Sequence, residues 1–135
     1  MKFESSTLED IQQIQEWTDA DEYHHGQNNP AWWITGNGSY LAGCIQDDEG
    51  TVLYFRFDRE DPLLRLNIQF APIEKVSKRR VVQALLGTFS NIEMLARAAQ
   101  FTGLIFASES PRLILFLDKL GFKQEGENFI LRFGE

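Results

Sequence analysis

Apolar side chains recur along this chain of 135 residues with two different periods. A spacing of three to four residues, which places apolar side chains on one face of a helix, predicts helices over residues 7–17, 77–100 and 111–121. Strict alternation of apolar and polar side chains, typical of a half-buried strand, is clearest over residues 63–70, LLRLNIQF. The pattern therefore predicts a domain that mixes helices with strands.

Shorter apolar runs add further strands, and turn signals separate them. Asp47, Asp48 and Glu49 lie between two such runs and predict a hairpin turn. The remaining expected strands lie at 3–7 (as a strand or a helix cap), 39–46, 51–58 and 103–108, with a pair within 122–133. Three antiparallel strands thus separate the first two helices, one strand separates the second helix from the third, and two strands follow. This order predicts a single α/β domain over residues 1–135, with helices around one mixed sheet.

Composition narrows the class of protein. The hydrophobic fraction is 43% and the aromatic fraction 13%, which indicates a folded globule rather than a disordered acidic chain. No apolar run reaches the roughly 18 residues of a membrane span, and the first ten residues lack the apolar core of a signal peptide. The single cysteine, Cys44, excludes an internal disulfide, and no Cys/His cluster has the spacing of a zinc site. We therefore expect a cytoplasmic protein without a metal site.

Charge is distributed unevenly around the net value of −7. Residues 1–61 carry 13 acidic and 3 basic side chains, whereas residues 62–135 carry 7 acidic and 10 basic ones. This split predicts a cationic partner at one end of the molecule and an anionic partner at the other, or a surface kept soluble by scattered charge. Because there is no dense basic face and the isoelectric point is near 4.8, the chain is not expected to bind nucleic acid.

The start of the long predicted helix has an unusual charge pattern. Ser77 is a favourable N-cap, but Lys78, Arg79 and Arg80 fill the first turn. A helix N-terminus carries a partial positive charge and favours acidic side chains at this position. The three cations therefore either extend into water or receive an anion.

The order of the elements and the stretch LDKLGF, residues 117–122, resemble the GCN5-related N-acetyltransferase (GNAT) fold. The topology covers most of the chain, and the sequence-specific part of the resemblance lies in residues 70–86 and 110–122. In that family, a glycine-containing loop at the start of a long helix holds the pyrophosphate of acyl-CoA through backbone N–H groups. The resemblance therefore implies acetyl-CoA as the cosubstrate, and a small-molecule or protein amine as the acceptor.

When this chain is aligned with the family's phosphate loop, the glycines of the loop are absent, because Lys78, Arg80 and Val82 replace them. Either the cations replace the backbone contacts, since Arg and Lys bind phosphate by charge, or the site has decayed. The resemblance also implies that backbone N–H groups at Phe70 and Ala71 polarise the thioester carbonyl. The residues implied in cofactor binding are Phe70, Ala71, Ser77, Lys78, Arg79, Arg80, Val81, Val82 and Ser110.

The second matching segment implies a missing proton donor. Ser110 stands at a family Asn that touches CoA, and Leu117 stands where a Tyr commonly protonates the departing thiolate. Leucine can neither donate nor accept a proton, and Tyr40 or Tyr54 can take this role only where the fold brings it near. Together with the basic, glycine-poor loop, the Phe-Leu pair that ends in Leu117 is similar to GNAT-like proteins of tailed bacteriophages.

The polar stretch 18–30, TDADEYHHGQNNP, is predicted to be a loop with a broken second helix, and it carries the candidate acceptor site. Its carboxylates would attract a cationic amine, and either His24 or His25 is a candidate base near neutral pH unless the pair only lies on the surface. Trp32 and Trp33 follow, either as walls of an acyl or amine pocket or as core residues. The residues implied in substrate binding are Asp19, Asp21, Glu22, His24 and Trp33.

The expected function is transfer of an acetyl or acyl group from acyl-CoA to a primary amine, by direct attack in a ternary complex. Glu74, which lies between the alternating strand and the long helix, is either a candidate base or a solvated loop carboxylate. The alternative is a non-catalytic GNAT-like module of a phage or prophage, used for binding or virion assembly, with a decayed CoA site.

Overall fold

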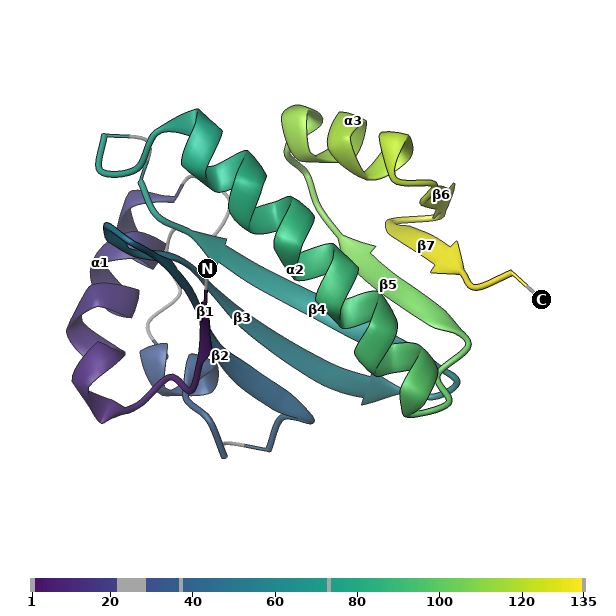
Figure 1. The fold of residues 1–135 in the computed structure, drawn as a ribbon, viewed down its shortest axis with the longest axis horizontal. Helices are drawn as coiled ribbons and strands as arrows, with labels where there is room; N and C mark the ends of the chain where they lie inside the picture. Colours follow the sequence, from purple (N-terminus) through teal and green to yellow (C-terminus); the bar gives the residue numbers. More distant parts are fainter. Residues whose placement is uncertain (1, 22–28, 37, 73, 135) are drawn as a thin grey trace.

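The computed structural model describes residues 2–21, 29–36, 38–72 and 74–134 of the chain. These residues form a seven-stranded sheet in the order β1-β2-β3-β4-β5-β7-β6, with helices packed on it (Figure 1). The strands are β1 (Lys2–Glu4), β2 (Leu41–Asp47), β3 (Gly50–Glu60), β4 (Leu63–Phe70), β5 (Gly103–Ala107), β6 (Lys123–Glu125) and β7 (Asn128–Arg132). The helices are the 3-10 turns η1 (Leu8–Asp10) and η2 (Pro30–Trp33) and the α-helices α1 (Ile11–Ala20), α2 (Lys78–Ala98) and α3 (Pro111–Lys119).

The sheet is mixed, as the order of the elements predicts. The pairs β1–β2, β2–β3 and β3–β4 are antiparallel, the pair β4–β5 is parallel, and the pairs β5–β7 and β7–β6 are again antiparallel. The parallel pair requires a crossover connection, which α2 supplies as it runs across one face of the sheet (Figure 1). The predicted α/β fold is confirmed.

The two faces of the sheet are covered by different helices. On β3, Tyr54 accepts a hydrogen bond from Gln13 Nε2 of α1 (2.8 Å), and Arg56 Nη1 donates to a carbonyl oxygen of η2 (2.8 Å). Because successive side chains of a strand point to opposite faces, Phe55 and Phe57 lie on the side covered by α2. Apolar side chains are therefore buried on both sides of the central strands.

Burial on both faces explains one departure from the expected strand pattern. Leu64, Leu66 and Ile68 of β4 are buried, as the alternation predicts, whereas Phe70 is half-buried. Gln69 occupies a polar position in the pattern and is nevertheless fully buried, because α1 covers that face of β4. Its Nε2 donates to the carbonyl oxygen of Phe70 (3.0 Å), so the buried amide is hydrogen-bonded.

The predicted helices are confirmed, with small shifts at their ends. Helix α2 begins after Ser77, whose Oγ accepts a hydrogen bond from the Arg80 N–H (3.3 Å), as expected of an N-cap. The first predicted helix begins as η1 and continues through α1 to Ala20, so residues 18–20 of the expected loop are helical. Residues 22–28 of that loop lie outside the described residues.

Candidate active site

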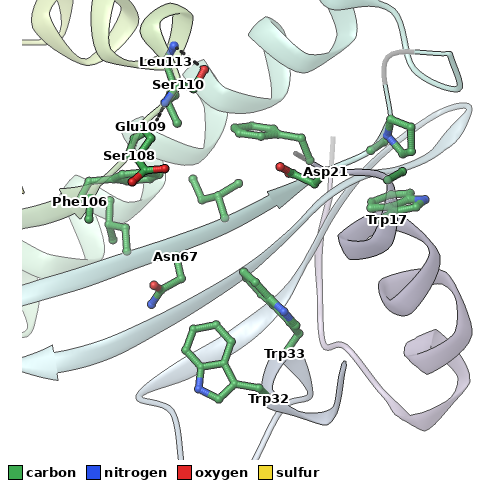
Figure 2. Close-up of a pocket in the computed structure, with 17 residues that line it drawn as sticks. Trp17, Asp21, Trp32, Trp33, Asn67, Phe106, Ser108, Glu109, Ser110 and Leu113 are labelled. Carbon is green, nitrogen blue, oxygen red and sulfur yellow. Dashed lines mark hydrogen bonds between the residues drawn. The ribbon is translucent and has the colours of Figure 1, made fainter. Parts of the chain in front are cut away.

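The pairing between β4 and β5 stops partway along both strands. Their register ends where Leu66 pairs with Phe106, and β4 then continues to Phe70. A cavity of about 700 Å³ lies where the two strands separate (Figure 2). It is lined by the end of α1, by η2, and by side chains of the stretches 66–72 and 106–113. The opening of the sheet thus creates the space for a ligand.

The open edge of β4 offers a backbone donor to this cavity. The Ala71 N–H donates to the Val52 carbonyl oxygen (3.0 Å), so this group bonds β3. Consecutive residues of an antiparallel ladder alternate between bonding toward the partner strand and away from it. The Phe70 N–H therefore points toward the β5 side, where the described part of β5 has no residue paired with it. The Phe70 N–H thus lies at the open edge of β4, whereas the expectation for Ala71 is corrected because its N–H is already bonded.

The turn between β5 and α3 is held by two serine hydroxyls. Ser108 Oγ accepts a hydrogen bond from the Ser110 N–H (3.1 Å), and Ser110 Oγ accepts one from the Leu113 N–H (3.4 Å) as the N-cap of α3. Ser110, implied in cofactor binding, lines the cavity together with Ser108 and Glu109. Glu109 was not predicted as a site residue, although it lies just after the carboxyl end of a strand, where α/β sheets commonly bind ligands.

Two residues of the predicted acceptor site lie in or next to α1. Asp21 follows the end of the helix and lines the cavity, where its Oδ2 accepts a hydrogen bond from Gln69 Nε2 (3.0 Å). Asp19 is exposed outside the cavity, and its Oδ1 accepts a hydrogen bond from Gln15 Nε2 (2.8 Å). Outside the described residues lie Glu22, His24 and His25. The structure thus brings Asp21 to the cavity and leaves Asp19 away from it.

Both tryptophans of η2 line the cavity and also pack in the core. Trp33 is only 2% exposed, and its ring meets that of Trp32 edge-on, with the centroids 4.8 Å apart. The Arg56 guanidinium lies 4.4 Å from the Trp32 ring centroid and donates to the Trp32 carbonyl oxygen (2.8 Å). Asp58 accepts a hydrogen bond from Arg56 Nε (3.1 Å) and so compensates this largely buried charge. The two tryptophans therefore contribute both to the core and to the cavity wall, and binding of an acyl or amine group there stays a prediction.

Of the three cations at the start of α2, Arg80 is paired with a carboxylate. Its Nε and Nη2 each lie 2.6 Å from an oxygen of Asp47, at the end of β2. The two side chains are only 16% and 19% exposed, and the hydrogen bonds from Arg80 lower the pKa of the Asp47 carboxyl to about 2. The expectation that Arg80 binds a phosphate is corrected, because its charge anchors α2 to the β2–β3 hairpin.

The side chains of Lys78 and Arg79, at the same helix end, remain available to a ligand. Both side chains are exposed, and neither forms an ion pair or a side-chain hydrogen bond with the described residues. Their N–H groups lie in the first turn and have no carbonyl partner within the helix, whereas the Val81 N–H donates to the Ser77 carbonyl oxygen (3.1 Å). Val81 and Val82 were predicted in the phosphate-binding loop, and this prediction is corrected. Both lie inside α2, where their N–H groups form the hydrogen bonds of the helix.

In the described part of the chain, no tyrosine lines the cavity. Leu117 is 0% exposed and belongs to the hydrophobic core. Tyr54 is buried, its OH donates to Asp10 Oδ1 (2.7 Å), and burial raises the pKa of Tyr54 well above its usual value. Tyr40 packs edge-on against Phe101 with the ring centroids 5.4 Å apart. Neither Tyr40 nor Tyr54 can therefore replace the proton-donating Tyr that is absent at position 117.

Other candidate groups lie away from the cavity. Glu74 is exposed in the turn before α2 and does not line the cavity, so its assignment as the base is corrected, since a base must reach the proton it accepts. Cys44 is buried in β2, and burial raises the pKa of its thiol. The described residues contain no group of three His, Cys, Asp or Glu side chains able to hold a metal ion. Nor does the described chain contain a helix of the length and hydropathy that a membrane crossing needs.

Sequence comparison does not assign this chain to a family, since no protein-family model and no curated protein matches it. Solved structures match it in fold. A GNAT superfamily phosphinothricin acetyltransferase from Sinorhizobium meliloti, in complex with AcCoA, has a TM-score of 0.72 at 18% identity and covers 99% of this chain and 89% of its own.

Two further structures are similar over the same length. A spermidine N-acetyltransferase chimera from Vibrio cholerae and hSSAT has a TM-score of 0.71 at 10% identity, over 98% of this chain and 96% of its own. The ribosomal-protein-alanine N-acetyltransferase from Escherichia coli has a TM-score of 0.70 at 12% identity, over 96% of this chain and 90% of its own. With its mixed seven-stranded sheet opened between β4 and β5, this chain has the fold of the GNAT acetyltransferases.

Proposed function

We propose that this chain is an acyl-CoA-dependent N-acetyltransferase that transfers an acetyl group to a primary amine. The observation that carries the proposal is the cavity between the separated ends of β4 and β5, in a chain with the GNAT fold. The Sinorhizobium meliloti acetyltransferase with the same fold is in complex with AcCoA, which supports acetyl-CoA as the cosubstrate. Fold alone does not establish chemistry, so the proposal rests on the side chains and backbone groups around the cavity.

The cofactor would meet two parts of the chain. At the start of α2, Lys78 and Arg79 combine exposed charge with N–H groups free of helical partners, which is the arrangement that binds a pyrophosphate. At the edge of β4, the Phe70 N–H is placed to donate to the thioester carbonyl oxygen as negative charge develops on it. Ser110 lines the same cavity beside the separated strands. Binding and carbonyl polarisation would thus come mainly from the backbone.

The acceptor would occupy the part of the cavity beside α1 and η2. Asp21 supplies negative charge that attracts an ammonium group, and Trp32 and Trp33 supply an apolar wall. Structures with the same fold are named for phosphinothricin, spermidine and a ribosomal-protein alanine as their substrates. We therefore extend an amine acceptor, either a small molecule or a protein, to this chain.

Binding of acetyl-CoA followed by an acetylation screen tests this function. A ligand at about 100 times its dissociation constant should raise the free energy of unfolding by about 2.7 kcal/mol, which is measurable as a shift in melting temperature. Release of the CoA thiol would then be followed with spermidine, phosphinothricin and a peptide with an N-terminal alanine. Absence of both the thermal shift and thiol release would contradict the proposal.

A second candidate function is a non-catalytic GNAT-like binding module, such as a phage or prophage protein. The specific observation in its favour is Leu117, which is fully buried. It stands at the family's proton-donor position, and leucine cannot donate a proton. This candidate predicts either no binding of acetyl-CoA, or stabilisation by acetyl-CoA without thiol release for any amine. The screen described above therefore separates the two functions.

A further inference from the structure

Among the described lining residues, Asp21 and Glu109 bring carboxylates into the cavity, and they do so from different sides (Figure 2). Asp21 approaches from the end of α1, where Gln69 Nε2 donates to its Oδ2 (3.0 Å). Glu109 approaches from the turn between β5 and α3, is exposed, and forms no hydrogen bond or ion pair with the described residues. Asp21 is thus a fixed charge, whereas the lone pairs of Glu109 remain open to a ligand.

The backbone around Glu109 is fixed although its carboxylate is not. The flanking Ser108 and Ser110 hydroxyls accept hydrogen bonds from the N–H groups of Ser110 (3.1 Å) and Leu113 (3.4 Å), which secures both sides of the turn. Glu109 follows the last strand pair, at Phe106, by three residues, and it lines the same cavity as the β4 edge. A carbonyl held by the β4 edge would therefore lie in a cavity that this carboxylate also enters.

We propose that Glu109 is the catalytic base that accepts the proton lost by the acceptor nitrogen. The inference rests on the acetyltransferase function proposed above and adds a residue to it. Of the other candidates in the described chain, Glu74, Tyr40 and Tyr54 lie outside the cavity. Asp21 lies inside it but already accepts a hydrogen bond from Gln69 Nε2 (3.0 Å). The Glu109 side chain reaches the cavity from a fixed turn and is not committed to another partner, as a base requires.

In the proposed reaction the acetyl group is transferred by addition to the carbonyl and elimination of the thiolate. The lone pair of a neutral amine forms a bond to the thioester carbonyl carbon, and the carbonyl electron pair moves to oxygen. The nitrogen, now positively charged, transfers a proton to a Glu109 carboxylate oxygen. The carbonyl then re-forms, the carbon–sulfur bond breaks with its electron pair on sulfur, and the thiolate takes a proton from solvent. Glu109 then releases its proton to solvent, so the products are the N-acetyl amine and CoA, and no oxidant or reductant is needed.

Steady-state kinetics of the full chain test this role, with acetyl-CoA and the best acceptor among spermidine, phosphinothricin and the alanine peptide. E109Q should lower kcat by about 10²- to 10⁴-fold, the usual loss on removing a general base, while the Kd for acetyl-CoA stays unchanged. D21N should chiefly raise the KM for the amine. E74Q is the matched control, an exposed carboxylate outside the cavity whose removal should leave kcat unchanged.

Chemical rescue separates a base from a structural residue. Added formate should restore thiol release and amine acetylation in E109A but should not raise the activity of E74A, because only E109A leaves room for a small carboxylate beside the reacting nitrogen. Wild-type kcat in E109Q, or a kcat loss in D21N without one in E109Q, would overturn the assignment while leaving the acetyltransferase function intact. A wild-type protein that acetylates no amine would overturn the function itself, and this inference with it.

Discussion

Helices α2 and α3 are both capped by a serine but differ in the groups around the cap. Ser77 caps α2 and Ser110 caps α3, and each serine Oγ accepts a hydrogen bond from the N–H three residues later, at 3.3 and 3.4 Å. Lys78 and Arg79 follow the first cap, whereas Glu109 precedes the second. Helix α3 also begins with Pro111, which has no N–H, and carries Arg112 in its first turn, so the two starts differ in backbone donors as well as in side-chain charge.

Different groups determine where a helix begins and which ligand its start can bind. A serine cap satisfies one orphan N–H and defines where each helix begins, whatever charge surrounds it. Lys78 and Arg79 reinforce the preference of the α2 start for an anion, whereas at the start of α3 the Glu109 carboxylate offsets the charge of Arg112 and Pro111 removes one N–H donor. This difference agrees with the proposals made above, phosphate binding at the start of α2 and proton transfer at the turn before α3.

Reversing the charge at the start of α2 should have the largest effect, because it removes the feature that distinguishes this helix start from that of α3. The double variant K78E/R79E should weaken acetyl-CoA binding by about 10- to 100-fold, since a hydrogen bond to a charged group contributes about 1.5–3 kcal/mol and 1.4 kcal/mol is tenfold in affinity. Titration calorimetry over a salt series measures the loss. K123E, on the edge strand β6, is the control, and equal losses in both proteins would contradict a phosphate site on α2.

Enlarging Leu117 tests how α3 is anchored. Because its side chain is 0% exposed, L117Y should overpack the core and lower the free energy of unfolding by about 1–3 kcal/mol. L115Y is the matched control on the same helix, since Leu115 is 65% exposed, and it should leave stability nearly unchanged. Urea unfolding measures both. An L117Y protein of wild-type stability would show that position 117 faces the cavity instead of the core.

The smallest effect is expected from the ion pair that anchors α2. Arg80 lowers the pKa of Asp47 to about 2 in the folded protein, from a reference value of 3.8. The contribution to stability is therefore present above pH 3.8 and lost as the pH falls toward 2. D47N should remove this contribution, roughly 1 kcal/mol, and with it that part of the acid sensitivity.

Urea unfolding at several pH values between 2 and 7 measures the difference between wild type and D47N. D48N, a change at the exposed neighbouring residue, should retain the wild-type slope. An identical slope in D47N would show that the Arg80–Asp47 pair does not contribute to the acid sensitivity of folding.

The elements and caps could be predicted from the sequence because their causes are local. The alternation in residues 63–70 and the Ser77 cap each depend on neighbours within a few positions, and both are present in the structure. The GNAT order of elements followed from them. The burial of Gln69 did not, because it depends on α1, which lies about fifty positions earlier in the chain.

The candidate site was harder to predict because partners distant in sequence decide which groups are open. Arg80 looks equivalent to Lys78 and Arg79 in the sequence, but Asp47, 33 positions away, binds it. Glu109 lies in an unremarkable Ser-Glu-Ser turn and becomes a candidate only where β4 and β5 separate. Charge pattern alone could not distinguish an anchoring cation from one open to a ligand.

The short pairing between β4 and β5 also has a mechanical consequence. Four residues of β4, Leu63–Leu66, hold β5 together with the β7–β6 hairpin to the rest of the sheet, whereas eight pairs join β3 to β4. A cofactor that accepts a hydrogen bond from the Phe70 N–H would add an interaction at a point of β4 where β5 provides none. Occupancy of the cavity would then stabilise the segment from β5 to β7 against local unfolding, so that amide exchange in β5 and β7 would slow when the cofactor binds.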